Sequence, residues 1–144
     1  KQKPWGVKVD ICMPCAYQNE IGMEEIKKIV DENNTKYYIE VANMPTTNEA
    51  LNYAMSKKGV IVAPSKAVNA GGVAVSALEM SQNSMRYSWE GEEVDAKLKN
   101  IMKNIHANSA AAAEEYGMGY NLVAGANIAG FKKVAAAMMA QGLI

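Results

Sequence analysis

The sequence predicts an α/β region with a parallel sheet over residues 1–68, followed by an all-helical segment over residues 69–144. In the first half, three short β-rich runs alternate with single helical patterns, which is typical of consecutive βαβ units. Beyond Asn69 the strand signals stop and only helical patterns remain. Because a crossover through one helix makes successive strands parallel, we expect the first half to form one parallel sheet.

The three strands are predicted at residues 7–13, 37–42 and 60–63, and Pro14 and Pro64 end the first and the third. Between the strands, residues 18–34 and 48–57 carry apolar side chains at near-helical spacing, with Thr47 as N-cap of the second helix. In the second half, helices are predicted at residues 70–87, 92–116 and 128–141. The last of these carries an apolar stripe expected to pack against a neighbouring helix: Ile128, Phe131, Val134 and Met138.

Composition excludes several classes of protein. The chain of 144 residues has 15 Lys and Arg against 15 Asp and Glu, so no overall charge attracts nucleic acid or anionic lipid. Polar residues interrupt every apolar run, so we expect no membrane-spanning helix, and we expect no secretory signal after Lys1. Two cysteines are too few for a disulfide-stapled secreted domain, which favours a cytoplasmic protein. Because the first residue is Lys1 and not Met, we expect the natural start to lie upstream.

The segments that follow the three strands are the places to search for a site, because ligands of open parallel sheets bind beyond the carboxyl ends of the strands. These are residues 14–19, 43–47 and 64–72, and all three are rich in small and amide side chains. Such residues suit hydrogen bonding to an uncharged ligand edge better than acid or base chemistry. The sequence therefore predicts a polar ligand site without an obvious catalytic acid or base.

The third segment also opens a helix that carries polar groups on one face. Gly71 and Gly72 allow close backbone approach where a helix begins. Asn69, Val73 and Ser76 then recur at helical spacing, so a serine hydroxyl is expected to face a ligand. The alternative is structural: Ser76 bonds back to a carbonyl of its own helical turn.

Two other patterns have competing interpretations. Cys12 and Cys15 form a C-x-x-C pair that in a strand–turn–helix context suggests thiol redox chemistry. Against that hypothesis, Cys12 ends an apolar run, which favours two packed thiols. His106 lacks partners at metal-ligand spacing, and the chain contains no G-x-G-x-x-G fingerprint.

Four blocks of sequence nevertheless carry a resemblance over essentially the whole chain. The blocks are DICMPCAYQNEI, YIEVANMPTTNEAL, VAPSKAVNAGGVAVSALEMSQNSMRYSW and YNLVAGANIAGFKKVAAAMMAQG. In this order they resemble the carboxyl-terminal segments of hexameric glutamate dehydrogenases, most closely the bacterial NAD-linked branch. The resemblance implies the second half of a Rossmann-like dinucleotide-binding domain and reversible, NAD(P)-linked oxidative deamination of L-glutamate to 2-oxoglutarate and ammonia.

The resemblance also implies roles for six residues. Ser76 resembles the serine that hydrogen-bonds the side-chain carboxylate of the substrate. Val73 resembles the valine that lines the same pocket. The residues that resemble cofactor-binding positions are Asn43, Asn69, Ala16 and Gln18. NAD is the expected cofactor, with NADP as the alternative, and a homohexamer is the expected assembly.

The sequence departs from the family at two positions and lacks the family's upstream segments. Tyr17 stands where the family usually has Thr, and Cys12 where Ala is common. The catalytic lysine and aspartate of the family, and its glycine fingerprint, belong to segments upstream of these blocks, so the isolated chain is expected to be inactive. The alternative hypothesis is a non-catalytic Rossmann-like fragment that serves in binding or oligomerisation.

Overall fold

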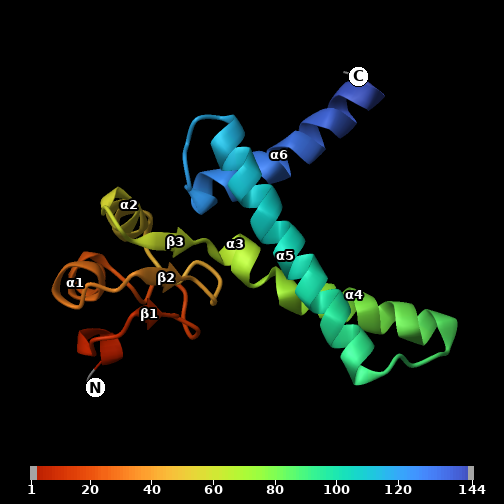
Figure 1. The fold of residues 1–144 in the computed structure, drawn as a ribbon, viewed down its shortest axis with the longest axis horizontal. Helices are drawn as coiled ribbons and strands as arrows, with labels where there is room; N and C mark the ends of the chain where they lie inside the picture. Colours follow the sequence, from red (N-terminus) through yellow and green to blue (C-terminus); the bar gives the residue numbers. More distant parts are fainter. Residues whose placement is uncertain (1–2, 143–144) are drawn as a thin grey trace. The chain divides into compact units, whose positions relative to one another are not determined.

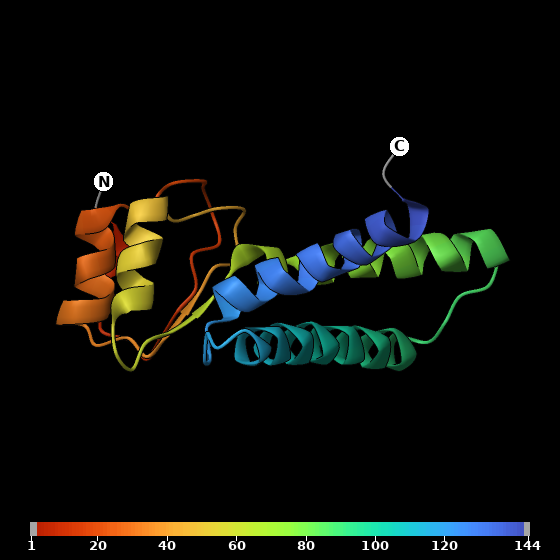
Figure 2. The same ribbon diagram turned by 90° about the horizontal axis from the view of Figure 1, so that it is seen from above.

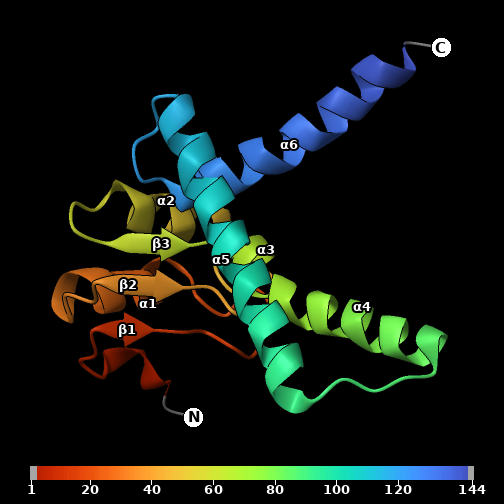
Figure 3. The same cartoon turned by 45° about the vertical axis from the view of Figure 1, so that its right-hand side comes forward.

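The computed structural model describes residues 3–142, which fall into two compact units, Lys1–Asn69 and Ala70–Ile144. The first unit contains a three-stranded sheet in the order β1-β2-β3, formed by Ile11–Cys12, Tyr37–Ile39 and Ile61–Ala63. Both strand pairs are parallel, and the three arrows run side by side in Figure 3. The prediction of a parallel α/β first half is confirmed.

A buried row of side chains crosses the middle of this sheet. Cys12 pairs with Tyr38, and Tyr38 pairs with Val62, so the three side chains share one register and one face. All three are buried. This row places the carboxyl ends of the three strands next to one another.

The helices of the first unit cover one face of the sheet. Helix α1 (Met23–Lys27) continues into a π-helical turn, η2 (Lys28–Glu32), and α2 (Asn48–Ser56) follows β2. Successive right-handed crossovers that progress in the same direction place their helices on the same side, and Figure 2 shows α1 and α2 side by side. Their buried side chains fill the core: Ile26, Ile29, Val30, Ala50 and Ala54. Thr47 caps α2 as predicted, because its side chain accepts the N–H of Ala50.

The first strand is shorter than predicted. Residues 7–13 were expected to be extended throughout, but only Ile11–Cys12 forms a strand, preceded by a single 3-10 turn, η1 (Pro4–Gly6). The carbonyl of Val9 accepts the hydroxyl of Thr35 at 3.0 Å, and that of Val7 accepts the amide of Asn33 at 3.2 Å. Side chains thus replace the backbone ladder at the start of this run. The structure also adds a one-turn helix, α3 (Ser65–Val68), within the third predicted loop.

Up to Gly142, the second unit forms three helices, as predicted. They are α4 (Ala70–Met85), α5 (Gly91–Glu115) and α6 (Leu122–Gln141), and α5 contacts both of the others (Figure 1). Helix α6 begins at Leu122 instead of residue 128, because Asn121 caps it by accepting the N–H of Ala124 at 3.0 Å. Gly and Ala dominate its first turns, so the apolar periodicity there was too weak to mark the true start.

Small residues set the distance between α5 and α6. Gly125 is buried, and a Cβ atom at that position would collide with the carbonyl oxygen of Ser109 and touch Ala113. A second glycine of the same helix, Gly130, has open space around it. The absence of a side chain at Gly125 therefore permits the two backbones to approach closely.

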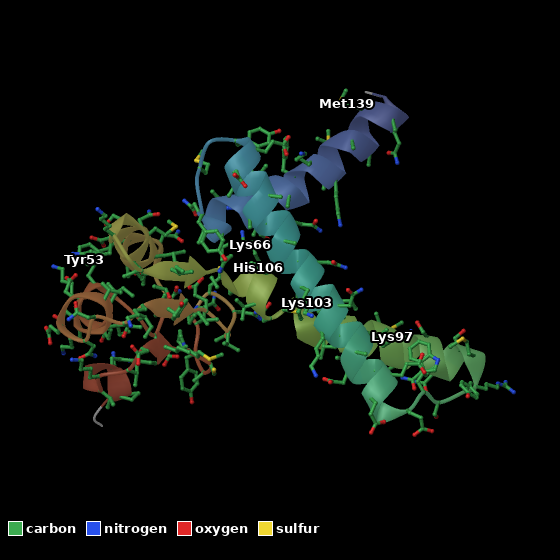
Figure 4. All side chains as sticks on the ribbon, viewed as in Figure 1. Tyr53, Lys66, Lys97, Lys103, His106 and Met139 are labelled. Atoms are coloured by element: carbon green, nitrogen blue, oxygen red, sulfur yellow. The ribbon has the colours of Figure 1, made fainter. Side chains whose placement is uncertain are left out.

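The apolar stripe of α6 does not pack as predicted. Within the described part of the helical unit, Phe131, Val134 and Met138 are exposed, and Met139 at the far end of α6 is 85% exposed (Figure 4). Ile128, the fourth residue of the predicted stripe, is half-buried, so the expected packing is wrong for the other three residues.

The expectation that no helix could span a membrane is wrong for helix α6. It is 20 residues long and apolar enough to cross a bilayer by length and composition alone, although we expected no such helix. Lys132 and Lys133 lie at its midpoint, where each charge costs about 2.5 to 3.5 kcal/mol in a bilayer. These two charges argue against a spanning role for α6.

The two cysteines lie in different environments. Cys12 is buried in β1, and burial, followed by the nearby Cys15 and Glu20, raises the pKa of its thiol to about 11. Cys15 is exposed, and its thiol donates to the carbonyl of Met13 at 3.1 Å. The expectation of two packed thiols is therefore confirmed for Cys12 and wrong for Cys15. The raised pKa of the buried thiol nevertheless argues against a redox role for Cys12, because a reactive thiol needs a lowered pKa.

Replacing Gly125 with alanine tests the close approach of α5 and α6. We expect Gly125→Ala to destabilise the chain by roughly 2 to 3 kcal/mol, because its Cβ overpacks the helix pair. Gly130→Ala is the matched control and should raise stability by up to about 1 kcal/mol through helix propensity. Thermal unfolding followed by circular dichroism at 222 nm measures both, and equal midpoints for the two variants would contradict this packing.

Thiol titration separates the two cysteines. With Ellman's reagent at pH 8, Cys15 should react at once and Cys12 only when the chain unfolds, since a thiol with a raised pKa holds little thiolate. As the pH rises from 9 towards 11, the unfolded chain ionises Cys12 before the folded chain does, so this burial should cost stability in that range. The variants Cys12→Ala and Cys15→Ala assign the two rates, and two equally fast thiols would revive the redox hypothesis.

Candidate ligand site at the carboxyl edge of the sheet

The loops that follow β1 and β2 are bonded to each other. The N–H of Asn19 donates to the carbonyl of Met44 at 2.9 Å, and the N–H of Ile21 donates to that of Pro45 at 3.0 Å. Asn19 and Met44 both adopt positive φ, near 55° and 47°, a conformation that is costly for Met. The cross-loop bonds hold this strained backbone, so the two loops form one surface.

Buried polar side chains fix this surface to the sheet. The hydroxyls of Tyr38 and Thr46 lie 2.6 Å apart in the interior and join β2 to the second loop, while burial raises the pKa of Tyr38. The carboxylate of Glu40, also buried, accepts the N–H of Ser65 at 3.3 Å where α3 begins. These positioning residues were not predicted from the sequence. The only signal for Glu40 was a lone acidic residue inside the apolar run YYIEVA.

Two predicted cofactor residues contact each other directly. The side-chain nitrogen of Asn69 lies 2.6 Å from the Oδ1 of Asn43 and 3.2 Å from the carbonyl oxygen of Val41. Asn43 is exposed, whereas Asn69 is half-buried. The end of the third segment is thereby joined to the loop after β2.

The other two predicted cofactor residues lie in the loop after β1. Ala16 and Gln18 are exposed, and the side chain of Gln18 has no hydrogen bond to any residue between 3 and 142. Tyr17 between them is 75% exposed, and its N–H donates to the carboxylate of Glu20 at 3.3 Å. All four predicted cofactor positions therefore lie on segments at the carboxyl edge of the sheet. Their roles stay predictions.

The two predicted substrate residues lie on α4, in the helical unit. Val73 is 76% exposed, and Ser76 is exposed as well. Within the described chain the hydroxyl of Ser76 has no hydrogen-bond partner, whereas Ser81 donates to the carbonyl of Ala77 at 2.8 Å. Ser76 therefore does not bond back to a carbonyl of its own helical turn, and its hydroxyl is available to a ligand.

The two glycines at the start of α4 differ in what surrounds them. A Cβ on Gly71 would meet Leu98 and Met102 of α5, so this glycine serves helix packing. Gly72 has nothing within 4 Å of such an atom. Only Gly72 fits the expectation that a glycine lets the backbone approach a ligand.

The remaining sequence candidates do not form a metal site. His106 on α5 (Figure 4) lies with its Nε2 2.6 Å from the hydroxyl of Tyr120, and both side chains are exposed. No cluster of three or more His, Cys, Asp or Glu side chains suited to a metal ion occurs from Lys3 to Gly142.

Comparison with known proteins gives one consistent result. Residues 1–142 match the Glutamate/Leucine/Phenylalanine/Valine dehydrogenase family. The chain is 69% identical over 142 residues to the NAD-specific glutamate dehydrogenase of Clostridium symbiosum, covering 99% of this chain and 31% of that protein. It is 54% identical to the NADP-specific enzyme of Psychrobacter sp., covering 99% of this chain and 32% of the relative.

Solved structures agree with the sequence comparison. A glutamate dehydrogenase structure with 70% identity superposes with a TM-score of 0.94, covering 98% of this chain and 31% of that one. The chain thus spans about a third of the length of the relatives it matches. Sequence and fold agree over nearly all of its residues, and the chain belongs to the Glutamate/Leucine/Phenylalanine/Valine dehydrogenase family.

Proposed function

We propose that this chain supplies the later half of a Rossmann-like dinucleotide-binding domain and the substrate-contacting helices of a glutamate dehydrogenase. The reaction is the reversible oxidation of L-glutamate to 2-oxoglutarate and ammonia, with NAD as cofactor and NADP as the alternative. The observation that carries this proposal is the joined amide pair, Asn43 and Asn69, at the carboxyl edge of a parallel sheet. Ligands of open α/β sheets bind at that edge.

The strand order supports a Rossmann-like half domain. In that fold the second three strands follow one another in chain order, as β1, β2 and β3 do here. The first of them is an inner strand in the complete sheet, and inner strands carry apolar residues on both faces. Ile11 in β1 and Met13 directly after it fit this position, because both are large, apolar and exposed.

The candidate residues have distinct chemical tasks in the proposed reaction. When a nicotinamide cofactor is bound, the hydride acceptor and donor would be supplied by its ring. Asn43 and Asn69 hold an uncharged group of that cofactor, because amides bind such groups without introducing charge. The free hydroxyl of Ser76 donates to the side-chain carboxylate of glutamate, and the exposed Val73 beside it excludes water.

Assembly and location are further parts of the proposal. The exposed stripe Phe131, Val134 and Met138 on α6 favours burial against other protein, in keeping with a homohexamer of the complete enzyme. An accessible free thiol at Cys15 suits the reducing cytoplasm. Balanced charge and the central lysines of α6 argue against nucleic-acid and membrane partners. A non-catalytic oligomerisation fragment is the second candidate, favoured by the same exposed stripe.

A hybrid enzyme tests the proposed function. In it, this chain replaces the matching 31% of the Clostridium symbiosum enzyme, with which it shares 69% identity. We expect glutamate-dependent reduction of NAD, whereas the isolated chain should show none. The unmodified host enzyme is the control. A folded hybrid without activity would favour the non-catalytic alternative.

Ser76→Ala in this hybrid tests the substrate contact. Losing a hydrogen bond to a carboxylate costs about 1.5 to 3 kcal/mol of interaction free energy. We therefore expect kcat/KM for glutamate to fall roughly 10- to 150-fold, while the affinity for NADH stays unchanged. Ser81→Ala is the matched control, because that hydroxyl already bonds its own helix. Steady-state kinetics with glutamate and fluorescence titration with NADH measure the two effects. An unaltered KM for glutamate would remove Ser76 from the site.

A further inference from the structure

Tyr17 is a large aromatic residue with little protein around it. It is 75% exposed, and its hydroxyl has no hydrogen-bond partner between residues 3 and 142. Its backbone N–H, by contrast, donates to the carboxylate of Glu20 at 3.3 Å. An exposed phenol ring is stabilised when another surface removes it from water, so a ring presented in this way favours contact with a ligand.

The loop that carries Tyr17 is held on both sides of this residue. Before it, the carbonyl of Pro14 accepts the N–H of Ala42 at 3.0 Å. After it, the N–H of Asn19 donates to the carbonyl of Met44 at 2.9 Å. The tip of the loop is therefore fixed to the segment that follows β2. A side chain on a fixed backbone loses less conformational freedom on binding than one on a mobile loop.

Met44, which accepts one of these bonds, has an exposed side chain on a costly backbone. The side chain is 56% exposed, and φ is near 47°, where a Cβ atom meets the following carbonyl oxygen. Glycine would adopt this conformation without that steric cost. The Met44 side chain therefore adds little to the core and makes the backbone less stable. Residues held in such conformations cluster at ligand sites, which favours a binding role for this side chain.

The chemistry of these two side chains suits a flat aromatic ligand. A phenol ring packs on such a ligand face-on or edge-on, and a thioether makes favourable sulfur–aromatic contacts. Ligands of open α/β sheets bind at the carboxyl edge, and a dinucleotide extends over two half domains. The half with the glycine fingerprint holds the adenosine end, and this chain contains no such fingerprint. The flat group at this edge is then the nicotinamide ring.

We propose that Tyr17 and Met44 pack against the nicotinamide ring, and that Tyr17 raises cofactor affinity above that given by a smaller residue. The inference rests on the proposed function for the identity of the cofactor. Tyr17 stands where the family usually has Thr, and a threonine has no ring to offer. The contact is therefore specific to this chain and distinguishes it from the usual member of the family.

Tyr17→Thr in the hybrid enzyme is the decisive variant, because it introduces the residue that the family usually has and should fold. We expect the Kd for NADH to rise roughly three- to tenfold with the loss of the ring. Tyr17→Phe keeps the ring and should bind NADH as the unsubstituted hybrid does. Fluorescence titration with NADH measures each Kd. An unchanged Kd for Tyr17→Thr, or an equal loss for Tyr17→Phe, would overturn the proposal.

Tyr37→Thr is the matched control. Tyr37 is also exposed and belongs to the same unit, but it lies at the amino-terminal start of β2 and not at the carboxyl edge. The substitution removes the same ring from the surface. We expect no change in the Kd for NADH. A loss equal to that of Tyr17→Thr would assign the effect to a general disturbance of the unit and contradict the assigned contact.

Met44→Gly separates binding from stability. Glycine removes the steric cost, so the thermal midpoint should not fall, while loss of the thioether should raise the Kd for NADH roughly threefold. Arg86→Gly is the control, because Arg86 also has a positive φ, near 54°, and it should leave the Kd unchanged. A lower midpoint with an unchanged Kd would show a purely structural Met44 and remove it from the proposal.

ADP-ribose identifies the ring that Tyr17 contacts. This ligand carries the adenine and the pyrophosphate of the cofactor but lacks the nicotinamide. Displacement of NADH measures its affinity, and we expect equal values for Tyr17→Thr and the unsubstituted hybrid. If ADP-ribose loses as much affinity as NADH, Tyr17 contacts the adenosine part and the proposal fails.

These binding measurements do not require turnover, so they separate the inference from the proposed function. A hybrid that shows the expected binding pattern without oxidising glutamate would refute the proposed function and leave the contacts of Tyr17 and Met44 standing. An active hybrid whose affinity for NADH is the same with and without both substitutions would refute the inference alone.

Discussion

The parallel register of three short strands is the constraint on which the first unit depends. Cys12, Tyr38 and Val62 align across the sheet, so the strands end together and their following segments meet at one edge. Cross-loop backbone bonds and the Tyr38–Thr46 contact then hold these segments in place. The exposed amides at this edge are consequently carried by a fixed backbone, which limits the entropy lost when a ligand binds.

The helical unit packs differently, because its described residues, 70–142, form no sheet to align the helices. Close approach of α5 and α6 depends on the missing side chain of Gly125, and α4 meets α5 where Gly71 lies against Leu98 and Met102. Small residues thus determine the packing, while larger apolar residues such as Phe131 and Met139 remain exposed. Helices built in this way leave apolar surface for contacts beyond their own unit.

The candidate site combines uncharged hydrogen-bonding groups with few titratable ones. The predicted cofactor residues of the first unit include three amides, Asn43, Asn69 and Gln18, and the predicted substrate residue of the helical unit, Ser76, carries a hydroxyl. Amides and hydroxyls can orient a ligand through hydrogen bonds but do not exchange protons at neutral pH. The chain spans about a third of the length of its relatives.

The sequence by itself determined the parallel α/β half, the helical second half, the Thr47 cap and the family, because periodicity, capping and long motifs are local signals. It misplaced the first strand and the start of α6, since side-chain bonds to Val7 and Val9 and the cap at Asn121 override periodicity. Only the tertiary structure showed that Asn69 contacts Asn43, that Glu40 is buried at the edge and that Phe131, Val134 and Met138 of α6 are exposed. These features depend on residues distant in sequence, whose contacts no local pattern records.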